Sequence, residues 1–350
     1  MVGNFSIYLL FLIAMFVYSL ITPVNTYGET GIGLDEIQIR DPNIFVYGDK
    51  YYLTGTTHEY GFLGYSSDDL INWQSHGLIY QRNTSNYWAS YHFWAPEIAI
   101  RNDKFYMFFT AKNDTTHRAT GVAVADSPMG PYKDICEDPL TPQEYDCLDG
   151  HLYDAENGSE YLIYVNEWIQ DGVEGIGEMW IQEINSDYTK LLGEPTKLFQ
   201  GYDAEWSNAV IDGPSMLKYN GIYYLFWTSF GPDEGYNVGY AYSDNLHKNY
   251  QQSSDPFIGY ESGHTTWFRD KDTNELLITF HHPNYDPERC RITQLIWDEN
   301  KSSWKTEPEY FKRRNIAGYS VNIGLIIIFG YISMCYILYR ISHSLPTDER

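Results

Sequence analysis

A five-fold internal repeat is the feature of this sequence that most limits how the chain can fold. Each copy opens with a small or acidic residue, passes through a turn rich in Gly, Asn and Asp, and ends in a burst of aromatic and β-branched residues. Gly and Asn supply the positive φ angles that tight turns need, so each copy is predicted to form a β-hairpin. The hairpins open at Asp41, Ala95, Asp149, Asp212 and Gly263, and their aromatic bursts are 51–54, 105–109, 161–164, 223–227 and 276–280.

A third strand is expected after each hairpin, as in 120–125 and 238–242, and a weaker fourth strand follows a polar turn. Four strands repeated every 50 to 60 residues or so are typical of a propeller blade. No long helical period interrupts the pattern. We therefore predict an all-β fold, a five-bladed β-propeller, within residues 27–310. The aromatic content of 17%, with 33 Tyr and 10 Trp, favours strands and suits a protein that stacks on sugars.

The two ends of the sequence predict export and membrane attachment. Residues 7–21 form an apolar run with the length of a signal-peptide core, so 1–26 are predicted to be a signal segment, with an uncleaved anchor as the alternative. Residues 321–339 are long enough to cross a bilayer as one transmembrane helix, and 340–350 would form a short cytosolic tail. The basic run 312–314 falls on the predicted outer side, against the positive-inside tendency. We expect a single-pass membrane protein of the secretory pathway with a lumenal or extracellular propeller.

Several short features bear on compartment and partners. Four Asn-X-Ser/Thr triplets agree with export and predict a glycoprotein; they begin at Asn83, Asn113, Asn157 and Asn300. Cys136 and Cys147 bracket a polar loop and are candidates for a disulfide in an oxidising lumen. The 47 acidic against 23 basic residues give a net charge of −24, which repels phosphate backbones, so no nucleic-acid partner is expected.

The openings of the repeats carry the candidate chemistry. The first strand of each blade lies nearest the axis of a propeller, so the five openings are expected to meet at one end of the central channel. Asp41, Asp149 and Asp212 are predicted to occupy matching positions there, with Glu97 and His264 beside them. A single Asp at such a place is commonly a turn cap. Clustered carboxylates raise one another's pKa and cost stability, which points to a function.

Paired carboxyl groups predict the hydrolysis of a glycosidic bond. One carboxyl donates a proton to the leaving oxygen, and the other activates water or attacks the sugar. A third carboxyl can hold the acid in place and raise its pKa. Trp94, Trp168 and Trp206 are candidates for stacking on sugar rings, although packing between blades is the alternative for each. The expected partner is an oligosaccharide or polysaccharide.

Four motifs, in this order and spacing, resemble glycoside hydrolase family 43. They are Arg-Asp-Pro-Asn-Ile-Phe at 40–45, Phe-Trp-Ala-Pro-Glu-Ile at 93–98, Leu-Asp-Gly-His-Leu-Tyr at 148–153 and Asp-Gly-Pro at 212–214. The resemblance covers residues 40–304 and implies a five-bladed propeller of inverting enzymes that act on α-L-arabinofuranosides or β-D-xylosides. By this resemblance Asp41 is the general base, and Asp149 orients the acid and adjusts its pKa. His264 stands where the family often has a histidine near a central calcium or water; no cofactor is required, and calcium stays open.

The fourth blade departs from the family pattern. The family usually has Glu-Gly-Pro with Glu as the general acid, whereas this chain has Asp212, whose carboxyl reaches about 1.5 Å less far. A subgroup that resembles this chain more closely shares the Asp, which implies adapted geometry; Glu205 and Glu167 are the alternative donors. The prediction is an inverting O-glycosidase, and the alternative is a non-catalytic carbohydrate-binding propeller that acts as a surface receptor or adhesin. A retaining fructosidase-like enzyme lacks its expected opening motif here.

Overall fold

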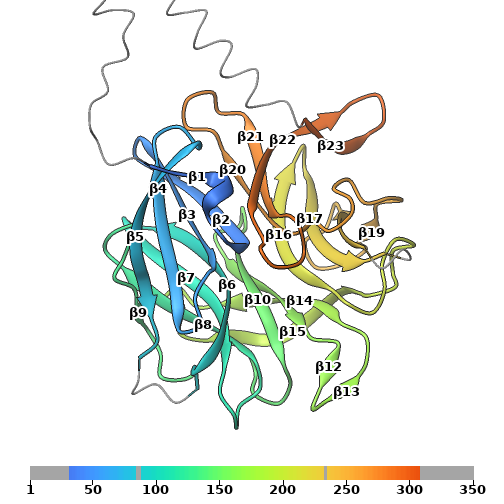
Figure 1. Ribbon diagram of the computed structural model, residues 1–350. Coiled ribbons are helices and arrows are strands. Elements are labelled where there is room, and N and C mark those ends of the chain that lie inside the picture. The colour runs from blue at the N-terminus through green and yellow to red at the C-terminus, as the bar shows by residue number, and fades with distance from the viewer. Residues whose placement is uncertain (1–30, 84–87, 232–234, 308–350) are drawn as a thin grey trace, which may run out of the picture.

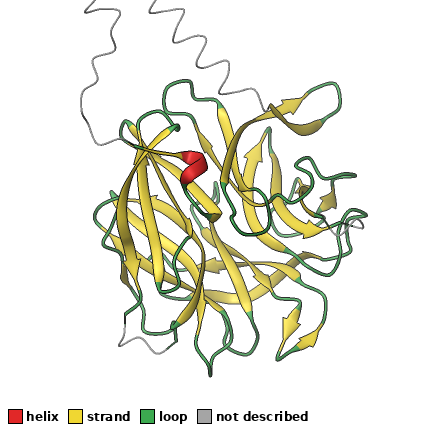
Figure 2. Cartoon of the chain, viewed as in Figure 1, coloured by secondary structure: helices red, strands yellow, loops and turns green. Residues whose placement is uncertain are grey.

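Each of the five sequence repeats folds into one antiparallel sheet, and the sheets are arranged around a common axis (Figure 1). The computed structural model describes residues 31–83, 88–231 and 235–307. The predicted all-β, five-bladed β-propeller is confirmed. Within these residues the one helical turn is η1 (Leu34–Glu36), and Figure 2 shows it beside the strands of the first blade.

The strands of each blade are hydrogen-bonded in chain order, and the first strands of neighbouring blades contact one another around the axis. Blade one contains β2 (Arg40–Tyr47), β3 (Lys50–Thr56), β4 (Gly61–Ser67) and β5 (Asn72–Gln81), with β1 (Ile32–Gly33) on its outer edge. Blade two contains β6 (Tyr91–Arg101), β7 (Lys104–Lys112), β8 (Ala119–Ala125) and β9 (Lys133–Asp134). Blade three contains β10 (Cys147–Asp154), β11 (Glu160–Asn166), β14 (Glu178–Ile184) and β15 (Leu191–Gln200), with a small hairpin of β12 (Ile169–Gln170) and β13 (Val173–Glu174). Blade four contains β16 (Asp212–Tyr219), β17 (Ile222–Phe230), β18 (Tyr236–Ser243) and β19 (Gln251–Gln252), and blade five contains β20 (Gly263–Arg269), β21 (Leu276–His281), β22 (Cys290–Asp298) and β23 (Ser303–Glu307).

The first strand of every blade carries the same irregularity near its start. The register with the second strand shifts there, and one residue in each shift has a positive φ; these residues are Asp41, Ala95, Asp149, Gly213 and His264. Such a bulge bends the strand and re-aims the side chain. Asp212 therefore stands one residue before the position of Asp41 and Asp149, and the prediction that all three occupy matching positions is wrong by one residue.

The hydrophobic core is divided into five clusters, one between each pair of neighbouring blades. Aromatic rings supply the largest fully buried side chains, among them Trp73, Trp227, Tyr51, Tyr80 and Tyr164. Flat, large rings fill the wedge between two twisted sheets with a large apolar area per residue. Much of the aromatic content that the sequence suggested for sugar stacking therefore serves the packing between blades.

The ring is closed by contacts between the first and the last blade, which share no strand. The backbone N–H of Ile39 donates to the carbonyl of Glu288 at 3.1 Å, and the hydroxyl of Thr266 donates to the carbonyl of Pro42 at 3.0 Å. One of the five core clusters joins residues of both blades, including Phe268. Closure thus depends on side-chain packing and a few hydrogen bonds across the seam.

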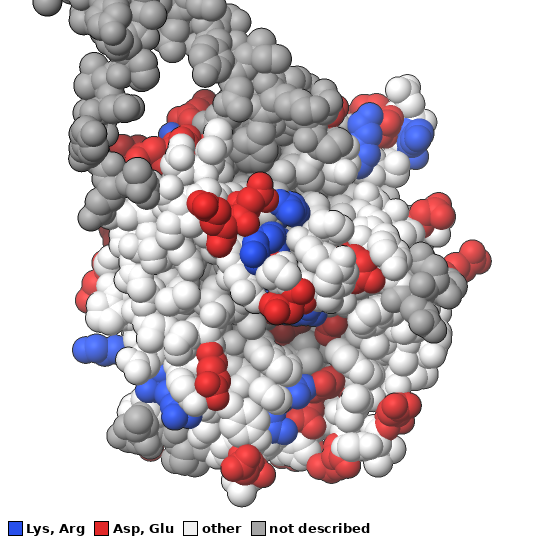
Figure 3. All heavy atoms as spheres, in the orientation of Figure 1, with Lys and Arg blue, Asp and Glu red and all other residues white. Residues whose placement is uncertain are grey.

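Some predictions fall on parts of the chain without a description. The segments 1–26, 321–339 and 340–350 lie outside the described residues, so the signal segment, the transmembrane helix and the cytosolic tail stay predictions. Among the described residues, no helix has the length and apolar character needed to cross a membrane. On the face shown in Figure 3, acidic side chains are spread widely and the basic ones lie interspersed among them.

The expected disulfide between Cys136 and Cys147 is wrong, because both thiols are free. Cys147 is buried at the start of β10, between blades two and three. Cys136 is partly exposed, and its Sγ lies 3.7 Å from the carbonyl oxygen of Thr189. The two side chains therefore pack against different neighbours.

Candidate active site

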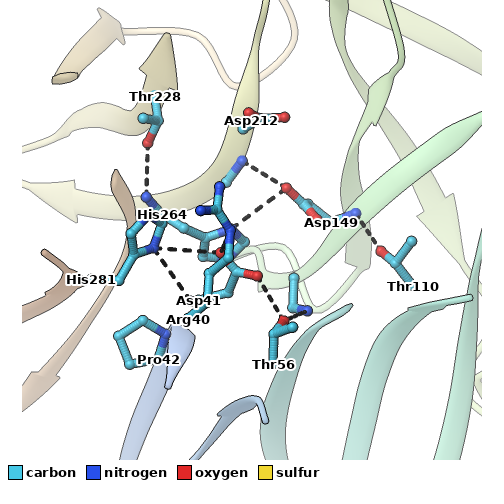
Figure 4. A network of polar contacts seen from close by, with 12 residues as sticks. Arg40, Asp41, Pro42, Thr56, Thr110, Asp149, Asp212, Thr228, His264 and His281 are labelled. Atoms are coloured by element: carbon cyan, nitrogen blue, oxygen red, sulfur yellow. Dashed lines mark hydrogen bonds and ion pairs between the residues drawn. The ribbon is translucent and has the colours of Figure 1, made fainter. Parts of the chain in front are cut away.

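Carboxylates from different blades gather around one histidine, His264, in a cluster called the hub from here on (Figure 4). The Nδ1 atom of His264 is 3.6 Å from Asp41 Oδ1 and 3.5 Å from Asp149 Oδ2, so these two oxygens are at most about 7 Å apart. The same oxygen of Asp149 accepts a hydrogen bond from the backbone N–H of Gly213 at 3.0 Å, beside Asp212. The fold therefore brings Asp41, Asp149, Asp212 and His264 together from four different blades.

Hydrogen bonds between blades hold the hub residues at their bulges. A threonine at the end of the second strand of one blade accepts the N–H of the positive-φ residue of the next blade: Thr56 from Ala95 at 2.8 Å, Thr110 from Asp149 at 2.9 Å, and Thr228 from His264 at 3.0 Å. At the seam, the N–H of Asp41 donates to His281 Nδ1 at 3.4 Å. The hydroxyl of Thr56 also donates to Asp41 Oδ2 at 2.7 Å, which orients that carboxylate.

Gly213 is required between the acidic side chains. Its φ is +57°, and a Cβ atom there would lie 3.0 Å from Cα, Cγ and Nδ1 of His264. A larger residue would therefore be strained in its backbone and would displace the histidine. The glycine lets blade four approach His264 closely enough for Asp212 to join the hub.

The hub gives Asp41 and His264 stable charges of opposite sign. Burial would raise the pKa of Asp41, but the positive charges of His264 and Arg40 outweigh it and hold this pKa below its usual range. Burial would lower the pKa of His264, whereas the carboxylates of Asp41 and Asp149 raise it to about 9. At neutral pH Asp41 is a carboxylate and His264 an imidazolium.

The pKa of Asp212 is shifted in the opposite direction from the pKa of Asp41. The loss of solvent around its carboxyl group, followed by the charge of Asp149, raises the pKa of Asp212 to about 7. The residues Asp41 and Asp149 are buried, whereas Asp212 is partly exposed. The hub thus holds one ionised carboxyl and one that is protonated in acidic and near-neutral solution, which is the arrangement that acid–base catalysis needs.

Trp94 presents one face of its indole to the cleft beside the hub. The rings of His92 and Trp94 are stacked at 4.3 Å, and the guanidinium of Arg118 lies 4.5 Å from the Trp94 centroid. Nη2 of Arg118 is only 3.5 Å from Nδ1 of His92. Two groups on opposite faces of the indole would be separated by about two contact distances of 3.5 Å each, so Arg118 and His92 cover the same face of Trp94. Trp94 also lines the cleft next to Asp41, and its role in stacking on sugars stays a prediction.

A broad cleft of about 1040 Å³ opens next to Asp41, between blades one and two. Arg40, Thr56, Tyr60, Arg82 and Trp94 are among its lining residues. This volume is at the upper end of the range for small-molecule sites. The cleft therefore has room for a ligand of several sugar units, and it borders the hub through Arg40 and Thr56, which both contact Asp41.

The other predicted site residues lie at different depths. Oε1 of Glu97 lies 2.7 Å from Nδ1 of His151, and Glu97 stands two residues beyond the bulge of its blade. Trp168 is partly buried against the core cluster between blades three and four. Trp206 is buried in that cluster: its indole lies 4.5 Å from the ring of Trp227, and its Nε1 donates to the carbonyl of Ser253. Trp206 is therefore a packing residue and is closed to a sugar.

The two alternative donors have different surroundings from Asp212. Glu205 is exposed in the turn that precedes blade four. Glu167 is buried, forms an ion pair with Arg118, and has a raised pKa because burial outweighs the charge of the arginine. Asp212 is the carboxyl group that faces Asp149, so the geometry favours it over both glutamates as the acid.

Calcium was left open by the sequence, and it stays open. Within 31–83, 88–231 and 235–307, no group of three or more His, Cys, Asp or Glu side chains is arranged to hold a metal ion. His264 faces two carboxylates and its raised pKa makes it a cation.

Three residues of the hub were not among the sequence candidates. Arg40 Nε lies 3.5 Å from Asp41 Oδ1, and Arg40 Nη1 donates to Asn284 of blade five at 2.7 Å. Thr56 orients Asp41, and Tyr236 donates to Asp212 at 2.7 Å. Arg40 stands inside a motif that the sequence did single out, whereas Thr56 and Tyr236 carry no local signal.

The fold and the hub define this chain as a propeller glycoside hydrolase. The model of Glycosyl hydrolases family 43 matches residues 36–301. The chain belongs to glycoside hydrolase family 43, which confirms the resemblance seen in its motifs.

Relatives whose names describe glycosidases support the same class of enzyme. The chain is 26% identical over 270 residues to beta-D-galactofuranosidase xynD of Aspergillus niger, covering 69% of this chain and 73% of that protein. It is 27% identical over 289 residues to the extracellular endo-alpha-(1->5)-L-arabinanase 2 of Bacillus subtilis, covering 74% and 59% of the two chains. The chain spans 38% of the length of a putative beta-xylosidase of Xylanibacter ruminicola.

Among solved structures, an endo-arabinase from Bacteroides thetaiotaomicron superposes with a TM-score of 0.72 at 28% identity, covering 78% of this chain and 99% of the other. A thermostable family-43 glycoside hydrolase superposes with a TM-score of 0.69 at 27% identity, covering 82% and 96%. The propeller fold is therefore shared over its full extent.

Proposed function

We propose that this protein hydrolyses the O-glycosidic bonds of α-L-arabinofuranosides or β-D-xylosides with inversion of the anomeric configuration. The observation that carries the proposal is the pair of carboxyl groups in one hub with oppositely shifted pKa values, Asp41 below and Asp212 above the usual range. Two carboxyl groups in opposite protonation states can act as base and acid in the same turnover. Relatives named as arabinanase and xylosidase support the substrate class.

The proposed reaction needs only water and these side chains. Asp41 takes a proton from a water molecule, whose oxygen forms a bond to the anomeric carbon. The bond from that carbon to the leaving oxygen breaks, and Asp212 donates its proton to that oxygen. Inversion requires about 6.5 to 9.5 Å between the two carboxyl groups, which leaves room for the water. Asp149 holds its place against Gly213 and keeps the pKa of Asp212 high through its negative charge.

A hydrolysis screen tests the proposal. Arabinan, xylan and aryl arabinofuranosides and xylosides are incubated with the purified protein, and the first anomer released is followed by NMR. Inverted product from any of these supports the proposal, and retained configuration contradicts it. Glycan binding without released sugar between pH 4 and 8 would support the alternative, a carbohydrate-binding receptor or adhesin.

Two variants test the assignment of roles. Asp41→Asn removes the base and should abolish turnover of every substrate. Asp212→Asn should lower turnover of natural glycans by about 10² to 10⁴ but spare dinitrophenyl glycosides, whose leaving group needs no proton. Asp126→Asn, at a side chain that is 90% exposed, is the matched control. Equal loss on both substrate types would show that Asp212 is not the acid.

We further propose that the propeller works in the lumen of the secretory pathway or outside the cell. The apolar segments near both ends of the sequence support this location. The side chains of Asn83, Asn157 and Asn300, which would carry the glycans, are exposed. Enzymatic removal of N-glycans should increase the mobility of the protein on a gel, and unchanged mobility would contradict glycosylation.

A further inference from the structure

Asp212 reaches the hub from a different backbone position than the other two carboxylates. Asp41 and Asp149 stand at the positive-φ residue of the bulge, and Asp212 stands one residue before it. The bulge that aims Asp41 and Asp149 is therefore not what aims the carboxyl group of Asp212. A separate contact must fix it.

That contact comes from Tyr236 at the start of β18. Its hydroxyl donates to Asp212 Oδ2 at 2.7 Å, and its side chain is buried with 2% exposure. Burial raises the pKa of the phenol well above its usual value, so the group stays protonated and remains a donor. The ring is held by Phe230 at 4.8 Å and is stacked on His281 at 5.8 Å.

A position without a side chain in blade five makes room for the ring of Tyr236. The residue before the positive-φ position is Arg40, Trp94, Leu148, Asp212 and Gly263 in the five blades, all within the described residues. A Cβ atom on Gly263 would lie 1.9 Å from Cε1 of Tyr236. The blade that faces Tyr236 thus has no side chain at the one position where any side chain would displace the ring.

We propose that Tyr236 is the positioning residue of the acid: it holds Oδ2 of Asp212, so that Oδ1 carries the proton to the leaving oxygen. This inference rests on the proposed function. The charged and titratable groups that face Asp212 are Asp149, Tyr236, Arg40 and His264. Asp149 favours the protonated carboxyl, whereas the hydrogen bond from Tyr236 and the charges of Arg40 and His264 favour the ionised form. Tyr236 therefore sets both the orientation of the Asp212 carboxyl group and its strength as an acid.

Tyr236→Phe tests the inference, with Tyr242→Phe as the matched control. Tyr242 lies on the same strand, and its hydroxyl donates to Gln251 at 3.1 Å in an exposed place. Loss of the Tyr236 hydroxyl should raise the pKa of Asp212 and move the alkaline limb of the kcat profile to higher pH. Turnover of alkyl glycosides and natural glycans should fall by about ten-fold or more with little change in KM, and dinitrophenyl glycosides should be spared.

Two outcomes would overturn the inference. The first is a Tyr236→Phe enzyme with the same pH profile and the same leaving-group dependence as Tyr242→Phe. The second is a folded Gly263→Ala enzyme that keeps the wild-type alkaline limb, because its Cβ must displace the phenol.

Failure of the proposed function is distinguishable from failure of this inference. If the wild-type protein cleaves no glycoside, the proposed function is wrong. The titration of ¹³C-labelled aspartate carboxyl groups, followed by NMR, then decides the inference without any turnover. One carboxyl that titrates near pH 7 and moves upward in Tyr236→Phe supports the contact; an unchanged titration overturns it.

Discussion

The hub predicts that Asp212→Asn stabilises the protein in a pH-dependent way. In the folded chain the pKa of Asp212 is raised to about 7 from the ordinary value of 3.8, by burial and then by the charge of Asp149. Between these two values the unfolded chain has already lost the proton that the folded chain keeps. The free energy of unfolding of the wild type should therefore fall as the pH rises from about 4 to about 7.

The magnitude follows from the width of that window. The difference is about three pH units, and each is worth about 1.4 kcal/mol, so the upper limit is about 4 kcal/mol. Asparagine carries no charge and its amide oxygen still accepts from Tyr236. The advantage of the variant should be near zero below pH 4 and should reach its full value above pH 7. In thermal unfolding this corresponds to about 8 °C at pH 8.

The assay is urea denaturation of wild type and variant at pH 4, 5.5, 7 and 8, with Asp126→Asn as a control that should show no pH-dependent difference. A variant that equals the wild type at pH 8 would refute the reasoning. A difference that is already complete at pH 4 would do the same, since it would come from packing and not from ionisation. Stability gained at the cost of turnover is a common property of residues that act in catalysis.

Four further outcomes are expected. His264→Gln removes a cation that holds the pKa of Asp41 down, so the acidic limb of the kcat/KM profile should move to higher pH. An unchanged limb would show that His264 does not control the pKa of the base. Trp206→Ala should lower the free energy of unfolding by about 3 to 5 kcal/mol in urea titrations, because the side chain is buried. Trp94→Ala should leave stability nearly unchanged and raise KM, and an unaltered KM would exclude it as a stacking platform. Arg118→Met should raise KM in the same way, because the guanidinium supports the indole, and a variant with wild-type KM contradicts that support.

The sequence predicted the features that local patterns determine. Hairpins, their turns and the number of blades follow from short repeated stretches, and Asp41 and Asp149 stand inside motifs of that kind. The one-residue offset of Asp212 could not be seen, because the register shift depends on pairing with β17 and leaves no mark in the motif. Matching motifs by their first residue aligned Asp212 with Asp41, whereas the backbone aligns Gly213 with it.

Contacts between blades account for most of what the sequence missed. The sequence left Trp206 as a candidate for stacking on sugars, but in the fold the neighbouring sheet covers it. Gly239 of that sheet leaves room for the indole ring. Tyr236 is 24 residues from Asp212 and is one of 33 tyrosines, so nothing local marks it. The disulfide prediction failed because Cys147 is buried in the core cluster between blades two and three, whereas the Sγ atom of Cys136 lies against the carbonyl oxygen of Thr189.

The seam of the ring has a consequence for how the enzyme is made. Asp41, the proposed base, belongs to the first blade, but its backbone and side chain contact His281 and His264 of the last blade, and Arg40 donates to Asn284. During synthesis, the contacts that tune the pKa of Asp41 can therefore form only after the last of the five blades has emerged and docked. A chain truncated before blade five would contain Asp41, Asp149 and Asp212 but would lack the contacts that complete the hub. Turnover would therefore show that the ring of blades has closed.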